Sequence, residues 1–154
     1  MRSETLDVTA AKYVLGLVDA ENLPALAMQW IQEGHDVPAL WQLASLTTPT
    51  REDAIPALKE ALQEIGVSLP DRRRAVMLLA LKTARRIVQS NLPPYEGANT
   101  IWQLTLLGDP EKFHDLDAFV YAASEWEDRC QDRAFFDRAI MQAAHKLLHD
   151  VGDE

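Results

Sequence analysis

Three carboxylates and a tryptophan stand close together late in the chain, in the stretch ASEWED. Paired carboxylates are groups that general acid–base catalysis uses. On a helix, Glu125 and Asp128 point outward together, whereas Glu127 falls on the buried side. A hydrolytic acid pair needs a second carboxylate at a set distance across a cleft, and the sequence indicates neither. We therefore expect Glu125 and Asp128 on a solvated or partner-binding face, and Glu127 in an internal ion pair with Arg85 or Arg86.

The spacings typical of metal ligands and nucleophiles are incomplete. His145 and His149 lie one helical turn apart, as zinc ligands do, but no third ligand follows from the spacing. Glu111 and His114 have the Glu-x-x-His spacing of di-iron bundles, which need a second copy that is lacking here. Cys130 has no activating partner that the sequence fixes. We therefore expect no metal, no cofactor and no catalytic residue.

The charge of the chain is distributed unevenly. The net charge is −9, and residues 109–128 contain seven acidic residues against one lysine, a balance of −6, whereas residues 51–90 carry +3. Repulsion disfavours nucleic acid and anionic membranes as partners, whereas a basic protein would be steered toward the chain. Tyrosine and tryptophan are favoured as interface anchors. The predicted partner-binding residues are Glu111, Asp115, Asp117, Tyr121, Glu125, Trp126 and Asp128.

Helical periodicity dominates the elements that must position these residues, and the alternation typical of strands is absent. The predicted N-caps are Asn22, Asp36 and Thr50, and the predicted C-terminal stops are Gly34 and Gly66. The expected helices are residues 8–18, a helix from Asn22 to Gly34, one from Asp36 to Leu46, one from Thr50 to Gly66, residues 71–90, one through Ile101 and Leu107 that Gly108 ends, and residues 116–127 and 132–149.

The predicted fold is an all-α, single-domain bundle of seven or eight short helices over residues 1–154. The connections are short, so neighbouring helices should lie side by side. The segments LPALAMQW and VPALWQLA resemble each other, which leaves helical-hairpin repeats open for the N-terminal half. Gly97, in the stretch YEGAN, is predicted to permit a close approach of two helices or a tight first turn. No signal peptide, membrane span or disulfide is indicated, so a cytoplasmic location is expected.

The segments PPYEGANTIW and ASEWED, followed by a final amphipathic helix that ends HKLLHD, resemble a group of small bacterial helical proteins without an assigned activity. The opening segment from YVLGLVDAEN to LWQLASL is also similar to that group. The resemblance implies an all-helical fold and carries over no catalytic residue. Small acidic proteins of this kind are similar in character to immunity proteins, which neutralise basic toxin domains by tight binding.

The predicted function is therefore that of a non-enzymatic acidic binding protein of the immunity type, which neutralises a basic bacterial toxin domain through steering and docking. The alternative is a regulatory or scaffolding adaptor that binds a peptide in a helical groove, which the near-repeat favours. A third hypothesis is an enzyme whose site is assembled from His35, His114 and Glu127.

Overall fold

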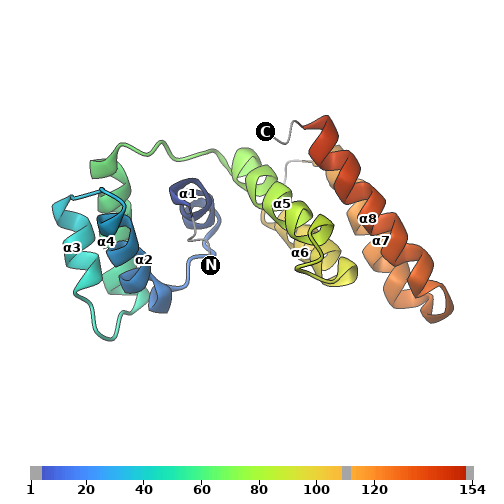
Figure 1. Ribbon diagram of the computed structural model, residues 1–154, viewed down its shortest axis with the longest axis horizontal. Coiled ribbons are helices and arrows are strands. Elements are labelled where there is room, and N and C mark those ends of the chain that lie inside the picture. The colour runs from blue at the N-terminus through green and yellow to red at the C-terminus, as the bar shows by residue number, and fades with distance from the viewer. Residues whose placement is uncertain (1–4, 109–111, 152–154) are drawn as a thin grey trace. The chain divides into compact units, whose positions relative to one another are not determined.

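The computed structural model describes residues 5–108 and 112–151, and these contain eight α-helices and no β-strand (Figure 1). The all-α prediction is confirmed. The α-helices are α1 (Leu6–Leu15), α2 (Leu23–Gln32), α3 (Pro38–Ala44), α4 (Arg51–Ile65), α5 (Arg72–Val88), α6 (Pro94–Leu107), α7 (Asp117–Asp128) and α8 (Arg133–Asp150). Three short 3₁₀ turns precede α2, α7 and α8: η1 (Ala20–Asn22), η2 (His114–Leu116) and η3 (Cys130–Asp132).

The contacts gather in two compact units, residues 1–75 and 76–154. Helix α5 begins in the first range and continues through the second. The single domain over residues 1–154 stays a prediction.

Several predicted helix ends are confirmed by their backbone geometry. The Thr50 hydroxyl accepts a hydrogen bond from the Asp53 N–H at 3.3 Å, which caps α4. Gly34 and Gly66 have φ angles of +110° and +93°, the left-handed conformation that ends helices α2 and α4. The first helix ends earlier than predicted, because Gly16 (φ +72°) adopts the same conformation.

Asn22 occupies the predicted N-cap position of α2 but makes no capping hydrogen bond with its side chain, and the predicted cap at Asp36 is wrong. The Asn22 side chain donates to the Asp19 carboxylate at 3.3 Å instead of capping α2. The Asp36 carboxylate accepts from the Trp41 indole N–H at 2.6 Å, and Val37 occupies the N-cap position of α3. In both cases the side chain bonds to a nearby side chain, Asn22 as donor and Asp36 as acceptor, and caps no helix N–H.

The core of the first unit is built from the near-repeat together with α4 and residues of α1 and the segment after it. Helices α2 and α3 pack on each other, and α3 packs on α4 (Figure 1). Each of these helices turns a row of buried apolar residues toward the inside of this unit, whereas Met28 of α2 and Trp41 of α3 are 43% and 49% exposed. The buried residues are Leu23, Ala27 and Trp30 of α2, Ala39, Leu40 and Leu43 of α3, and Leu58, Ala61 and Leu62 of α4.

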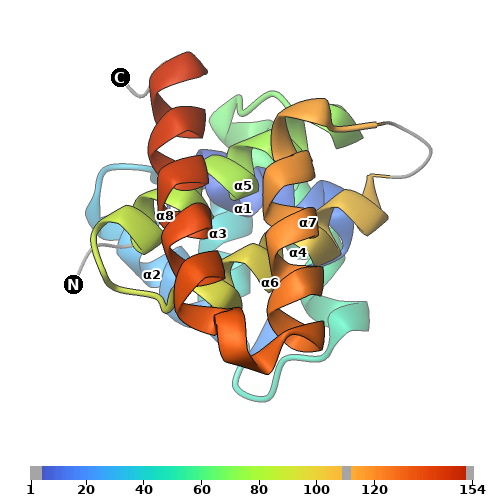
Figure 2. The same ribbon diagram turned by 90° about the vertical axis from the view of Figure 1, so that its right-hand side faces the viewer.

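The second unit pairs α7 with α8 and packs both on α6; Figure 2 shows α7 and α8 side by side. Phe119, Phe136 and Ile140 fill the space between these helices. The predicted close approach at Gly97 is confirmed: a Cβ there would lie 2.5 Å from the Ile87 side chain, so α6 meets α5 through a residue that must lack one. This packing fixes which face of α7 points outward.

Candidate partner-binding surface on α7 and α8

The outward face of α7 carries the residues that the helical wheel placed there. Phe119, Ala122 and Ala123 are buried. The Tyr121 side chain is 61% exposed, Asp128 is exposed and Glu125 is half-buried. Positions 121, 125 and 128 follow one another at spacings of four and three, so these three side chains line one face of the helix.

The acidic side chains on and before α7 differ in their partners. Asp117 lies 3.4 Å from Nδ1 of His114, and both side chains are largely exposed. Within residues 5–108 and 112–151, the carboxylates of Asp115, Glu125 and Asp128 have neither a hydrogen bond nor an ion pair. Glu111 lies outside the described residues. Three of the predicted contact residues therefore present unneutralised negative charge.

The prediction that Glu127 is buried is wrong. Its side chain is exposed, and it accepts a hydrogen bond from the Tyr95 hydroxyl at the start of α6. Glu127 lies in the last turn of α7, which ends at Asp128. Its neighbour is Tyr95, an aromatic residue with a polar hydroxyl at its tip. The Glu127 carboxylate bonds to this hydroxyl and stays in solvent. The proposed pairing with Arg85 or Arg86 stays a prediction.

The Glu127 carboxylate also affects the ionisation of its partner. The hydrogen bond from Tyr95 to Glu127, together with desolvation and the negative charge of Glu127, raises the pKa of the Tyr95 hydroxyl above its ordinary value of 10.0, while Arg133 acts in the opposite direction. The neutral phenol is therefore the form that this contact favours.

Trp126 is half-buried and joins three helices. Its ring stacks on Tyr95 of α6 with a centroid separation of 4.0 Å and an interplanar angle of 16°. The Arg133 guanidinium of α8 lies 3.8 Å from the ring centroid, and the indole N–H donates to Asp137 at 3.0 Å. These contacts hold the end of α7 against α6 and α8, and they engage much of the ring that was predicted to contact a partner.

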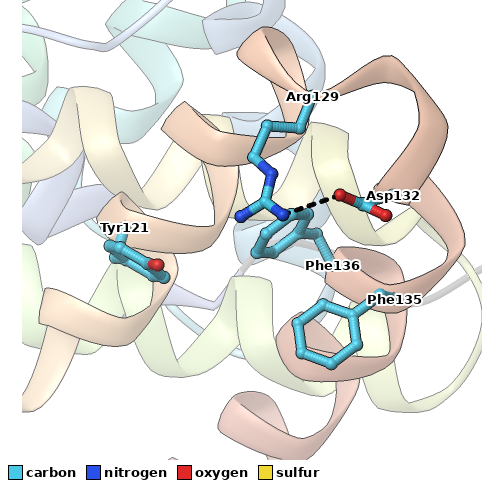
Figure 3. A pocket seen from close by; sticks show the side chains of 5 residues that line it. All are labelled: Tyr121, Arg129, Asp132, Phe135 and Phe136. Atoms are coloured by element: carbon cyan, nitrogen blue, oxygen red, sulfur yellow. Dashed lines mark ion pairs between the residues drawn. The ribbon is translucent and has the colours of Figure 1, made fainter.

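An open hollow lies between α7, η3 and α8, and sequence reasoning missed most of it (Figure 3). It measures about 460 Å³ and is lined by Tyr121, Arg129, Asp132, Phe135 and Phe136. Phe135 is 58% exposed, whereas Phe136 is buried and meets Phe135 edge to face at 5.0 Å. The signal available in the sequence was the pair of adjacent phenylalanines. On an amphipathic helix only one of two adjacent residues faces the protein core, so the other is expected on the surface.

A single ion pair closes one side of this hollow. The Arg129 guanidinium lies 2.8 Å from the Asp132 carboxylate across η3, and 5.5 Å from the centre of the Phe136 ring. Figure 3 shows this pair beside the Phe136 ring, with Phe135 and Tyr121 on either side. The two charges largely neutralise each other, so the aromatic walls and the free acids of α7 dominate the character of the surface.

The other sequence candidates do not assemble into a site in the described ranges. His145 and His149 are both exposed on α8, and no group of three or more potential ligands suited to a metal ion occurs there. Cys130 is exposed at the first position of η3. None of the described helices is long and apolar enough to cross a membrane.

Comparisons of the chain with protein-family models, with curated proteins and with solved structures found no match. The resemblance to small bacterial helical proteins therefore stays a prediction.

Proposed function

We propose that the protein is a non-enzymatic binding protein that docks a basic protein partner on the outward face of α7. The observation that carries this proposal is the state of Asp115, Glu125 and Asp128, whose carboxylates have no partner within the described residues. Charges retained without an internal partner are available to another molecule. Neutralisation of a basic bacterial toxin domain is the role that best suits such a surface.

In this proposal the acidic charge steers the partner at long range, and the exposed aromatic area binds it at short range. The −6 segment that contains α7 attracts a cationic surface over roughly a Debye length, about 10 Å at 0.1 M salt. Once the partner arrives, Tyr121, which is 61% exposed, offers contact area on the same face. Such an arrangement favours rapid association that weakens with salt.

The hypothesis of a site assembled from His35, His114 and Glu127 has little support. His114 precedes α7 and Glu127 lies at its other end, and a helix of 12 residues is about 18 Å long. The two groups therefore cannot act on the same small substrate. A protein without catalysis stays the proposal.

The adaptor hypothesis gains no support from the near-repeat. Leu23 and Ala27 of α2 and Leu40 and Leu43 of α3 lie in the core of the first unit, so these positions of the near-repeat are not available to line a peptide groove, whereas Met28 is 43% exposed. Trp41 is 49% exposed, but its indole N–H is bonded to Asp36 of the same segment.

The test reverses the charge of the proposed face. The double variant Glu125→Lys and Asp128→Lys should associate with the native partner at least about tenfold more slowly at low salt, because steering is lost and like charges meet. The partner is first captured from the host with the unaltered chain. The association rate constant is then measured by stopped flow or surface plasmon resonance.

The matched control reverses two exposed acids of the first unit, Glu21→Lys with Glu60→Lys, which changes the net charge by the same amount. A much smaller effect is expected, because these acids lie on other helices. Equal slowing by both double variants would show that only net charge matters, and an unchanged rate in the α7 variant would overturn the proposal.

A further inference from the structure

The hollow and the acidic face of α7 meet at one residue. Tyr121 forms a wall of the hollow, and it also stands at the head of the row that continues through Glu125 and Asp128. Asp128 immediately precedes Arg129, which lines the same hollow. An apolar recess therefore borders directly on unpartnered negative charge.

We propose that this hollow is an anchor site for an aromatic side chain of the basic partner, flanked in that partner by lysine or arginine. The proposal rests on the function proposed above and names the recognition element that the partner would use. Tyr121 and Phe135 present their rings to solvent at 61% and 58% exposure, so a guest ring would cover apolar area that the free protein leaves open.

The walls suit an aromatic guest. The rings of Tyr121 and Phe136 are 6.5 Å apart with an interplanar angle of 70°, and those of Phe135 and Phe136 are 5.0 Å apart at 88°. Edge-to-face arrangements of this kind extend readily to one more ring, because ring edges and faces carry opposite partial charges. The volume of about 460 Å³ falls in the range of ordinary small-ligand pockets, which leaves room for one large side chain.

The charges near the hollow determine which residues can flank the guest ring in the partner. Arg129 is paired with Asp132 at 2.8 Å, so its charge is balanced locally and need not repel a cationic neighbour. Glu125 and Asp128 follow Tyr121 on the same face of α7, and both lack an internal partner in the described chain. Basic residues next to the guest ring would meet these carboxylates, whereas acidic residues would be repelled.

The test uses two blocked peptides with the isotope-labelled full chain and follows amide and aromatic resonances by NMR. One peptide has tryptophan between two lysines on each side, and the other has alanine in place of tryptophan. The tryptophan peptide should bind about tenfold more tightly, because ring burial adds to the same charge attraction. Its largest shifts should fall on Tyr121, Phe135 and Phe136.

The outcomes separate this inference from the proposed function. Equal affinities, with shifts spread only over the acidic residues, would overturn the anchor site and leave the electrostatic proposal standing. The absence of any shift with either peptide would count against both. Phe135→Ala is the matched variant: it should remove the tenfold preference for tryptophan while binding of the alanine peptide stays unchanged.

Discussion

Trp126 and Tyr121 lie on the same helix, but Trp126 packs between helices and Tyr121 is exposed. Trp126 stacks on Tyr95, contacts Arg133 and donates to Asp137, so it joins α7 to both neighbouring helices. Tyr121 is 61% exposed, and its ring meets the buried Phe136 ring edge to face. Of the two aromatic residues expected to contact a partner, Tyr121 is the one that the fold leaves available.

The contact between Tyr95 and Glu127 makes the free energy of unfolding depend on pH in the alkaline range. Because the pKa of Tyr95 is higher in the folded chain than its ordinary value of 10.0, the contribution is fully present below pH 10 and is lost as the pH rises through the folded value. Tyr95→Phe should lower the free energy of unfolding by about 0.5–1 kcal/mol at neutral pH, and this difference should shrink above pH 10.

A titration of tyrosinate absorbance checks the direction of this shift. The chain has three tyrosines, and the component that disappears in Tyr95→Phe should be one that titrates above pH 10. Loss of a component at or below pH 10 would contradict the assigned contact.

At the scale of elements, the end of α5 shows a helix stop built with an unusual residue. The Asn91 N–H donates to the Arg86 carbonyl and the Ser90 N–H to the Ile87 carbonyl, which is the Schellman pattern. Ser90 stands at the position that glycine usually occupies, and its φ angle is +61°. A residue with a Cβ is strained there.

Ser90→Gly should therefore raise the free energy of unfolding by about 0.5–1 kcal/mol, because glycine adopts this conformation without strain. Urea denaturation measures the change. The reciprocal control is Gly66→Ser at the end of α4, where φ is +93°; that substitution should be destabilising. If Ser90→Gly were neutral or destabilising, strain at Ser90 would not be a measurable cost.

Element ends were predictable where the deciding contact is local. Thr50 and Gly66 act within one turn of their own helix, so the sequence indicates them directly. Asp36 has the right type for an N-cap but bonds to Trp41, a choice that depends on where an indole ring lies after folding. Glu127 fails for the same reason, since its partner is 32 residues away along the chain.

At the scale of the whole molecule, the sequence predicted the all-α class and the acidic face, and it missed the hollow. Amphipathic periodicity identifies the outward side of one helix at a time. The hollow exists only because the turn at η3 reverses the chain and brings Phe135 of α8 near Tyr121 of α7. Such a pairing of faces requires the packing of α7 on α8, which periodicity does not specify.

The division of contacts into two units leads to a prediction about cooperativity. The core cluster of the first unit, with the partly buried residues packed against it, draws on residues between Leu6 and Val67. Ile140→Ala, at a fully buried position in α8, should cost about 2–5 kcal/mol, and it should speed amide exchange in α6–α8 far more than in α2–α4. Leu58→Ala in α4 is the reciprocal variant, with the opposite pattern expected.

Hydrogen exchange followed by mass spectrometry measures both variants. Equal acceleration across α2–α4 and α6–α8 in either variant would instead show one cooperative unit, as the single-domain prediction requires.

The three-residue turn at η3 has a practical consequence. Cys130 is the only cysteine of the chain, its side chain is exposed, and it stands between Arg129 and Asp132, which both line the hollow. A thiol-reactive fluorophore would attach at this one position without any change to the sequence. The unaltered protein thus offers a reporter group at the rim of the recess, where the arrival of a guest would alter its emission.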